Sequence, residues 1–252
     1  TSKVNIRELF KRMNMSPNVI STIVSLREYL LKVLDEHKDL VPLDDDLREL
    51  FKSWFNPGFL KLAKITWETK AAVLEQIMKY ERVHEIKDMD ELKRRLGEDR
   101  RFFSYFHPAL EDEPIIFVQV ALTNGLGRSI QEITKPRLDG DQKYDSATFY
   151  SISNCQEGLS RVTLGNFLIK RVVFEIQEEL PNIKHFGTLS PIPGFRDWFS
   201  YLEDVKIKNI LGDVPIENIS FLKSSDLKVG DPRIVANKVA ITKLVAHYLM
   251  NE

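Results

Sequence analysis

The sequence predicts two parts, an all-α helical region followed by an α/β domain with a parallel or mixed sheet. Up to about residue 96, apolar residues recur at helical spacing with charged residues on the opposite face. From Arg101 onward, apolar, β-branched and aromatic runs bounded by prolines indicate buried strands. A strand, a loop, a helix and a strand then follow in the order of a crossover unit. We therefore divide the chain into a helical domain, residues 1–97, and an α/β domain, residues 98–252.

Four helices are expected in the first domain, because four segments repeat apolar residues at helical spacing. These segments are 19–37, 43–55, 66–86 and 87–97. The second starts with acidic residues, which suit a helix N-terminus. Thr66 opens the third helix, and Gly97 ends the fourth.

Four strands are expected in the second domain, at 100–108, 114–123, 146–154 and 183–191. An amphipathic helix over 164–181 separates the last two strands and makes them a parallel pair. The remaining sequence returns to helical patterns. Asp231 followed by Pro232 is expected to cap the final helix.

The composition argues against several classes of function. A formal net charge of −1 gives no reason to expect nucleic acid as a partner, and no apolar run reaches the roughly 18 residues of a membrane span. Cys155 is the only cysteine, and the five histidines lack the spacing of metal ligands. We expect a cytoplasmic protein without a metal, or a mitochondrial or peroxisomal one if a targeting segment precedes Thr1.

The connection between the third strand and the long helix is a candidate phosphate site. Gly158 lies in this loop and Gly165 opens the helix. Such a loop can direct unpaired backbone N–H groups at a ligand beside the helix N-terminus, where the dipole favours negative charge. The alternative is an ordinary connection whose glycine permits close packing. The pattern is neither a Walker loop nor a GxGxxG fingerprint.

Ser190 stands where the fourth strand gives way to a loop made rigid by Pro191 and Pro193. Ligands of open α/β sheets often bind at such strand ends. From the residues alone, Ser190 is either a catalytic hydroxyl or a turn residue that caps its own loop.

Six ordered blocks resemble the malonyl-CoA decarboxylase family over about Leu47–Phe199. The blocks are LRELFKSWFNPGFL, ITWETKAAVLEQIMKYERVHEI, FFSYFHPALEDEPIIFVQVALT, ATFYSISNCQEGL, LGNFLIKRVV and TLSPIPGF. The resemblance implies a helical domain followed by a GNAT-like (acyl-CoA N-acyltransferase) mixed-sheet domain. It also implies conversion of malonyl-CoA to acetyl-CoA and carbon dioxide without a metal or prosthetic group.

The resemblance assigns site residues. It makes Ser190 catalytic and gives the CoA pyrophosphate to the loop Ser160, Arg161, Val162, Thr163, Leu164, Gly165 and Asn166. Ser151 on the neighbouring strand is expected either near the thioester or paired within the strand. His107 is expected to be structural and His185 to lie on the surface.

Two departures from the family pattern accompany the resemblance. Arg161 stands where the family usually has glycine, so it either pairs with a phosphate or obstructs the backbone approach. The chain also ends before the segment that carries the family's catalytic histidine, so the sheet domain is expected to be incomplete at its C-terminus.

Three functions therefore stay open: a malonyl-CoA decarboxylase, a GNAT-fold acyltransferase, and a non-catalytic acyl-CoA-binding protein. The apolar faces of the helical domain suggest a homo-oligomer.

Overall fold

The computed structural model describes residues 19–134, 143–214, 219–223 and 231–251 of the chain. The chain divides into two compact units, residues 1–190 and 191–252. Each unit has a hydrophobic core of its own.

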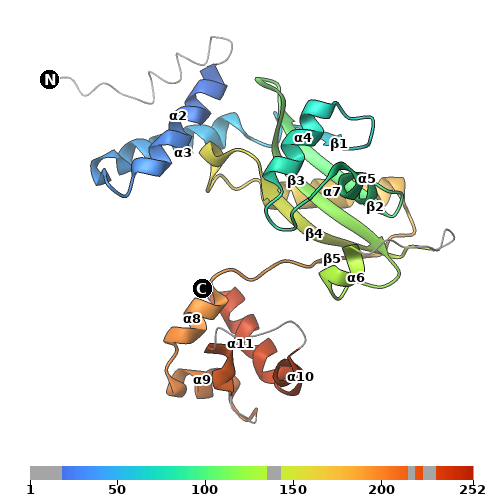
Figure 1. The fold of residues 1–252 in the computed structure, drawn as a ribbon. Helices are drawn as coiled ribbons and strands as arrows, with labels where there is room; N and C mark the ends of the chain where they lie inside the picture. Colours follow the sequence, from blue (N-terminus) through green and yellow to red (C-terminus); the bar gives the residue numbers. More distant parts are fainter. Residues whose placement is uncertain (1–18, 135–142, 215–218, 224–230, 252) are drawn as a thin grey trace. The chain divides into compact units, whose positions relative to one another are not determined.

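A mixed five-stranded sheet lies at the centre of the first unit (Figure 1), with its strands in the order β1-β2-β3-β4-β5. The strands are β1 (Lys61–Lys64), β2 (Arg100–His107), β3 (Leu110–Thr123), β4 (Ser146–Asn154) and β5 (His185–Thr188). Neighbours from β1 to β4 pair antiparallel, whereas β4 and β5 pair parallel. The predicted crossover and mixed sheet are confirmed.

Helices cover both faces of this sheet. Helix α7 (Gly165–Glu179) packs on one face through Leu168, Val172 and Ile176. Helices α4 (Ala71–Tyr80) and α5 (Met89–Arg95) pack on the other. Successive side chains of β3 alternate between these faces, since Val118 belongs to the α7 core and Phe117 to the α4 core. Short helix α6 (Ile130–Thr134) follows β3.

The N-terminal helices belong to the core on the α7 face. Helix α2 (Val19–Val33) and helix α3 (Val41–Trp54) lie close to the segments 19–37 and 43–55 that the sequence predicts. The short 3-10 turn η1 (Lys38–Leu40), which the sequence analysis does not predict, connects them. Most apolar residues of their helical repeats are buried, including Ile23 of α2 and Leu47 of α3, whereas Leu34 and Trp54 are half-buried. The apolar period therefore located both helices correctly.

Two segments of the predicted helical domain are not helical. Lys61–Lys64 forms strand β1, which pairs with β2. The sequence does not predict this strand, because four residues are too few to show an alternating pattern. They form a strand because they pair with β2. The helix expected from Thr66 begins only at Ala71, since the preceding residues form a turn in which Thr66 N–H donates to Thr69 Oγ1.

The second unit is helical. Its elements are α8 (Phe195–Tyr201), α9 (Asp204–Leu211), η3 (Ile219–Lys223), α10 (Pro232–Ala236) and α11 (Lys238–Asn251). Asp231 caps α10 as predicted, accepting from the Arg233 backbone N–H at 2.9 Å. The single final helix expected from the sequence is broken at Asn237. Within the described residues, no helix has the length and apolar character needed to cross a membrane.

Candidate functional site

The loop between β4 and α7 is held by alternate side chains. It contains the 3-10 turn η2 (Glu157–Leu159) and continues to Leu164. Val162 and Leu164 are buried in the core, whereas Arg161 and Thr163 are exposed. The apolar anchors therefore fix the loop while the residues between them face solvent.

The end of this loop presents backbone donors at a helix N-terminus. Among the described residues, no acceptor is found for the backbone N–H groups of Thr163, Gly165 and Asn166. The first turn of α7 contains no acidic residue. Free N–H groups at the positive end of a 15-residue helix can bind an anion, as the sequence predicts.

Arg161 has a left-handed backbone conformation, with φ at 65°. This region favours glycine, because a side chain there crowds the following carbonyl group. The guanidinium of Arg161 has no ion-pair partner among the described residues, and the side chain is exposed. The cation is thus available to a ligand at the loop.

The two loop glycines have different surroundings. A Cβ atom on Gly158 would lie 2.1 Å from the backbone oxygen of Val24, so only glycine lets the loop rest on α2. A Cβ atom on Gly165 would meet only Ile116 Cδ1, at 3.9 Å. Close packing therefore explains Gly158, and the protein fold leaves room for a side chain at position 165.

Ser190 lies just beyond the point where β4 and β5 stop pairing. The last paired residues are Phe149 and Thr188, and the Leu189 N–H donates to the Phe149 oxygen at 2.8 Å. Ser190 is exposed, and its hydroxyl has no partner among the described residues. The hydroxyl is free to meet a ligand. Its catalytic role stays a prediction.

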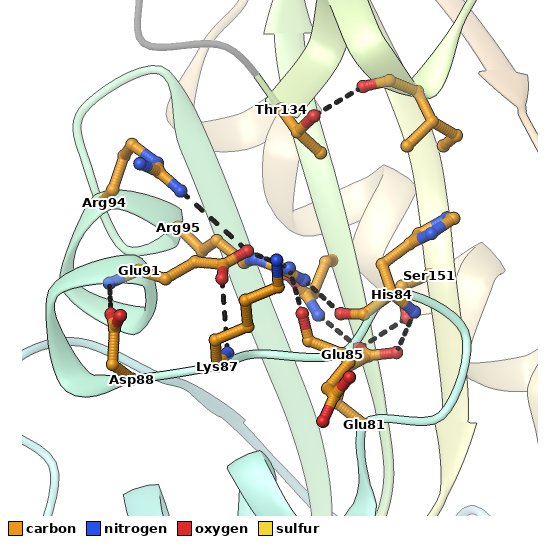
Figure 2. A network of polar contacts seen from close by, with 12 residues as sticks. Glu81, His84, Glu85, Lys87, Asp88, Glu91, Arg94, Arg95, Thr134 and Ser151 are labelled. Carbon is orange, nitrogen blue, oxygen red and sulfur yellow. Dashed lines mark hydrogen bonds and ion pairs between the residues drawn. The ribbon is translucent and has the colours of Figure 1, made fainter.

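The Ser151 hydroxyl points at a buried carboxylate on the α4 face of the sheet (Figure 2). It donates to Glu81 Oε2 at 2.6 Å. Glu81 is 4 % exposed and also accepts from the backbone N–H groups of Val83 and His84, at 2.8 and 2.9 Å. Gln119 donates to the same carboxylate. Ser151 is thus bound to another side chain rather than to the strand backbone, and its substrate role stays a prediction.

This carboxylate network continues beside an irregularity in the sheet. The register between β3 and β4 shifts at Tyr150, whose hydroxyl donates to Gln119 Oε1 at 2.8 Å. Burial raises the pKa of Tyr150 to about 12. His84 Nε2 lies 3.1 Å from the Tyr150 backbone oxygen. The polar cluster therefore holds the β4 bulge from the α4 face.

Helix α2 contacts the loop through a buried arginine that the sequence analysis missed. The Arg27 Nη1 atom donates to the backbone oxygens of Gly158 and Ser160, at 2.6 and 2.9 Å. Its Nε atom donates to Asp44 Oδ1 at 2.8 Å. The available signal was a cation at a core position of the helical repeat that includes Val24 and Leu30.

The two remaining titratable candidates lie as the sequence predicts. His107 is buried, its ring 5.0 Å from that of Phe55, and Nδ1 accepts from the Ala109 N–H at 3.1 Å. Burial lowers the pKa of His107. His185 is exposed. The surface position of His185 is confirmed. The burial and contacts of His107 agree with a structural role, which stays a prediction.

Protein-family comparisons cover almost the whole chain. A model of the malonyl-CoA decarboxylase N-terminal domain matches residues 2–55, and a model of the C-terminal domain matches residues 58–252. The chain belongs to the malonyl-CoA decarboxylase family. The family predicted from the sequence is confirmed. The division at residue 97 stays a prediction.

Curated and solved members of the malonyl-CoA decarboxylase family resemble this chain at moderate identity. The mitochondrial malonyl-CoA decarboxylase of Anser anser anser is 34% identical over 98% of this chain, and that of Rattus norvegicus is 38% identical over 80%. Crystal structures of the decarboxylases from Rhodopseudomonas palustris and Cupriavidus metallidurans match with TM-scores of 0.76 and 0.79. Their identities are 40% and 35%, over 96% and 98% of this chain.

This chain covers only part of each malonyl-CoA decarboxylase that it matches. It spans 54% and 43% of the two curated relatives. It spans 60% and 63% of the two solved structures. The activity of the longer relatives is therefore a proposal for this chain.

Proposed function

We propose that this chain supplies the acyl-CoA-binding loop and the active-site serine of a malonyl-CoA decarboxylase. The observation that carries the proposal is the set of free backbone N–H groups at the N-terminus of α7, in a chain of this family. The pyrophosphate of malonyl-CoA is a dianion, which such a helix N-terminus binds well. Malonyl-CoA is thus the substrate and acetyl-CoA and carbon dioxide are the products.

Decarboxylation of malonyl-CoA requires stabilisation of the negative charge that develops on the thioester. When the bond between the carboxylate carbon and the α-carbon breaks, its electron pair moves into the thioester as an enolate. A proton added to the α-carbon then gives acetyl-CoA. Catalysis requires a donor aimed at the thioester oxygen, where negative charge develops, and a proton source.

We assign to Ser190 either the donor at the thioester oxygen or the orientation of the proton source. Its exposed hydroxyl has no partner among the described residues, and it follows directly on the end of the β4–β5 pairing. It donates to the thioester oxygen or orients the proton donor, and it forms no covalent intermediate. The proton donor is the family's histidine, which belongs to a segment that follows the part of the family pattern present here. The Ser151 hydroxyl can contact substrate only if it gives up its hydrogen bond to Glu81.

CoA binding to the chain tests the loop assignment. Saturating CoA should protect the backbone amides of 160–166 from hydrogen exchange. At 100 times its dissociation constant, CoA should stabilise the fold by about 2.7 kcal/mol. Gly165→Ala should weaken CoA binding by crowding the phosphate while leaving the melting temperature of the free protein unchanged, because that Cβ atom has space in the protein. CoA that shifts neither exchange nor melting contradicts the assignment.

Substitution of Ser190 tests the catalytic assignment, in the chain extended by the histidine-bearing segment of the family. Ser190→Ala should lower kcat on the order of 100-fold with little change in malonyl-CoA binding, because the lost donor acts in the transition state. Release of carbon dioxide and formation of acetyl-CoA are the measurements. An alanine variant with full turnover refutes the role of Ser190.

The same assay separates the other candidate functions. An acylated amine or thiol in place of carbon dioxide would indicate an acyltransferase. Binding without any product, in the extended chain, would indicate an acyl-CoA-binding protein. A homo-oligomer through the helical region and a cytoplasmic or mitochondrial location remain parts of the proposal, testable by sedimentation and by imaging.

A further inference from the structure

The buried Arg27–Asp44 pair on helices α2 and α3 lies against the back of the acyl-CoA loop. Arg27 is 0% exposed and Asp44 is 4% exposed. One guanidinium nitrogen, Nη1, donates to two loop carbonyls, those of Gly158 and Ser160. The Cζ atom lies 5.9 Å from the centre of the Phe51 ring. Asp44 and Phe51 thus hold the guanidinium in one orientation from the helical side.

These hydrogen bonds determine which way the loop peptides face. A peptide group is planar and trans, so its carbonyl and the following N–H point in opposite directions. Because the Ser160 oxygen points at Arg27, the N–H of Arg161 points away from α2. Among the described residues that N–H has no backbone acceptor. It therefore joins the donors that the loop presents outward.

Arg27 also keeps two carbonyl oxygens away from the ligand. Carbonyl oxygens carry partial negative charge and would repel a pyrophosphate if the peptides turned over. Two hydrogen bonds to a cation, which are stronger than bonds between neutral groups, oppose such a rotation. The Gly158 contact with the Val24 backbone supports the same stretch from α2.

We propose that Arg27 is a positioning residue for acyl-CoA, which sets the peptide orientation of the pyrophosphate loop from the N-terminal helical region. The inference rests on the proposed function, because it requires CoA phosphates at 160–166. It gives the helical region a part in substrate binding in addition to any part in assembly. Arg27 acts by orientation and not by net charge, since Asp44 neutralises it at 2.8 Å.

The test compares malonyl-CoA with malonyl-pantetheine, which lacks the pyrophosphate, in the extended chain. The measured quantity is the ratio of the two kcat/KM values. Arg27→Lys keeps the charge but has a single nitrogen, which cannot replace both Nε at Asp44 and Nη1 at the two loop carbonyls. This ratio should fall about tenfold, through KM for malonyl-CoA, with kcat for malonyl-pantetheine unchanged. Arg27→Met should lower the ratio further.

Arg95→Lys is the matched control. Arg95 is also buried, at 6 % exposed, and donates to two backbone oxygens, those of His84 and Glu85, at 2.6 and 2.8 Å. Its substitution should cost stability without changing the substrate ratio. If Arg27→Lys and Arg95→Lys lower stability alike and both leave the ratio at the wild-type value, Arg27 is only structural and the inference is overturned.

The wild-type protein shows whether the proposed function itself fails, independently of Arg27. A wild-type protein that uses malonyl-CoA no better than malonyl-pantetheine has no pyrophosphate site at the loop, whatever Arg27 does. If Arg27→Met fails to fold, Arg27→Lys decides. The fold-change caused by Arg27→Lys should also be the same at low and high salt, because a neutral ion pair is exchanged for a neutral one.

Discussion

Arg161 combines two properties with opposite consequences for the protein. Its left-handed backbone, at φ 65°, stores conformational strain that glycine would not have. Its exposed guanidinium stands beside the backbone donors proposed to hold a dianion. Arg161 therefore lowers the stability of the fold but places a positive charge beside the proposed ligand.

Arg161→Gly separates the two properties. The free protein should become more stable by roughly 1 kcal/mol, because the strain disappears. CoA binding should weaken, and the loss should shrink at high salt as screening grows. Calorimetric unfolding and titration with CoA at two salt concentrations are the measurements. Unchanged or tighter CoA binding would mean that Arg161 faces solvent or obstructs the site.

At the scale of elements, the sequence predicts those whose signal is local. Helix α7 and strand β4 lie where periodicity and β-branched residues place them, and the Asp231 cap is recognisable from its neighbour Pro232. Strand β1 is not predictable in this way, because its four residues become a strand only by pairing with β2.

The site shows the same division between local and distant contacts. Local patterns single out the β4–α7 connection and Ser190, since a glycine-containing strand-to-helix connection and a proline-bounded strand end can be recognised in sequence. The narrower predictions, the pyrophosphate at 160–166 and catalysis by Ser190, come from the family resemblance. Arg27 and Glu81 were not named as site residues. Each contacts residues about 70 or more positions away, which no local pattern reports. The carboxylate of Glu81 lies in a segment predicted as helix that instead turns back toward β4.

The Glu81 cluster joins three elements of the sheet domain. The carboxylate lies at the end of α4 and accepts a hydrogen bond from Ser151 of β4 (Figure 2). It also accepts one from Gln119 of β3. Arg95 on α5 donates to the backbone at His84 and Glu85, which fixes the connection between the two helices. A buried carboxylate with this many donors is stable only while all of them stay in place. The cluster therefore links α4, α5 and the β4 bulge through buried and half-buried hydrogen bonds.

At the scale of the whole molecule, the two compact units have separate cores. The first includes Cys155, which is 1% exposed beneath α4 and α5. The second is built from residues of α8, α9, η3 and α11, including Phe199, Leu211 and Leu244. Separate cores of this kind are expected to unfold separately.

Chemical labelling of the Cys155 thiol can measure whether the first unit unfolds independently of the second. Burial raises the pKa of Cys155, and the thiolate is the reactive form, so labelling requires the first unit to open. A chain ending at Ser190 should label at the rate of the full chain, within about twofold. Leu92→Ala, in the core that contains Cys155, should speed labelling at least about tenfold, because such a cavity costs about 2–5 kcal/mol. Rapid labelling of the shortened chain would instead show that the first core depends on residues 191–252.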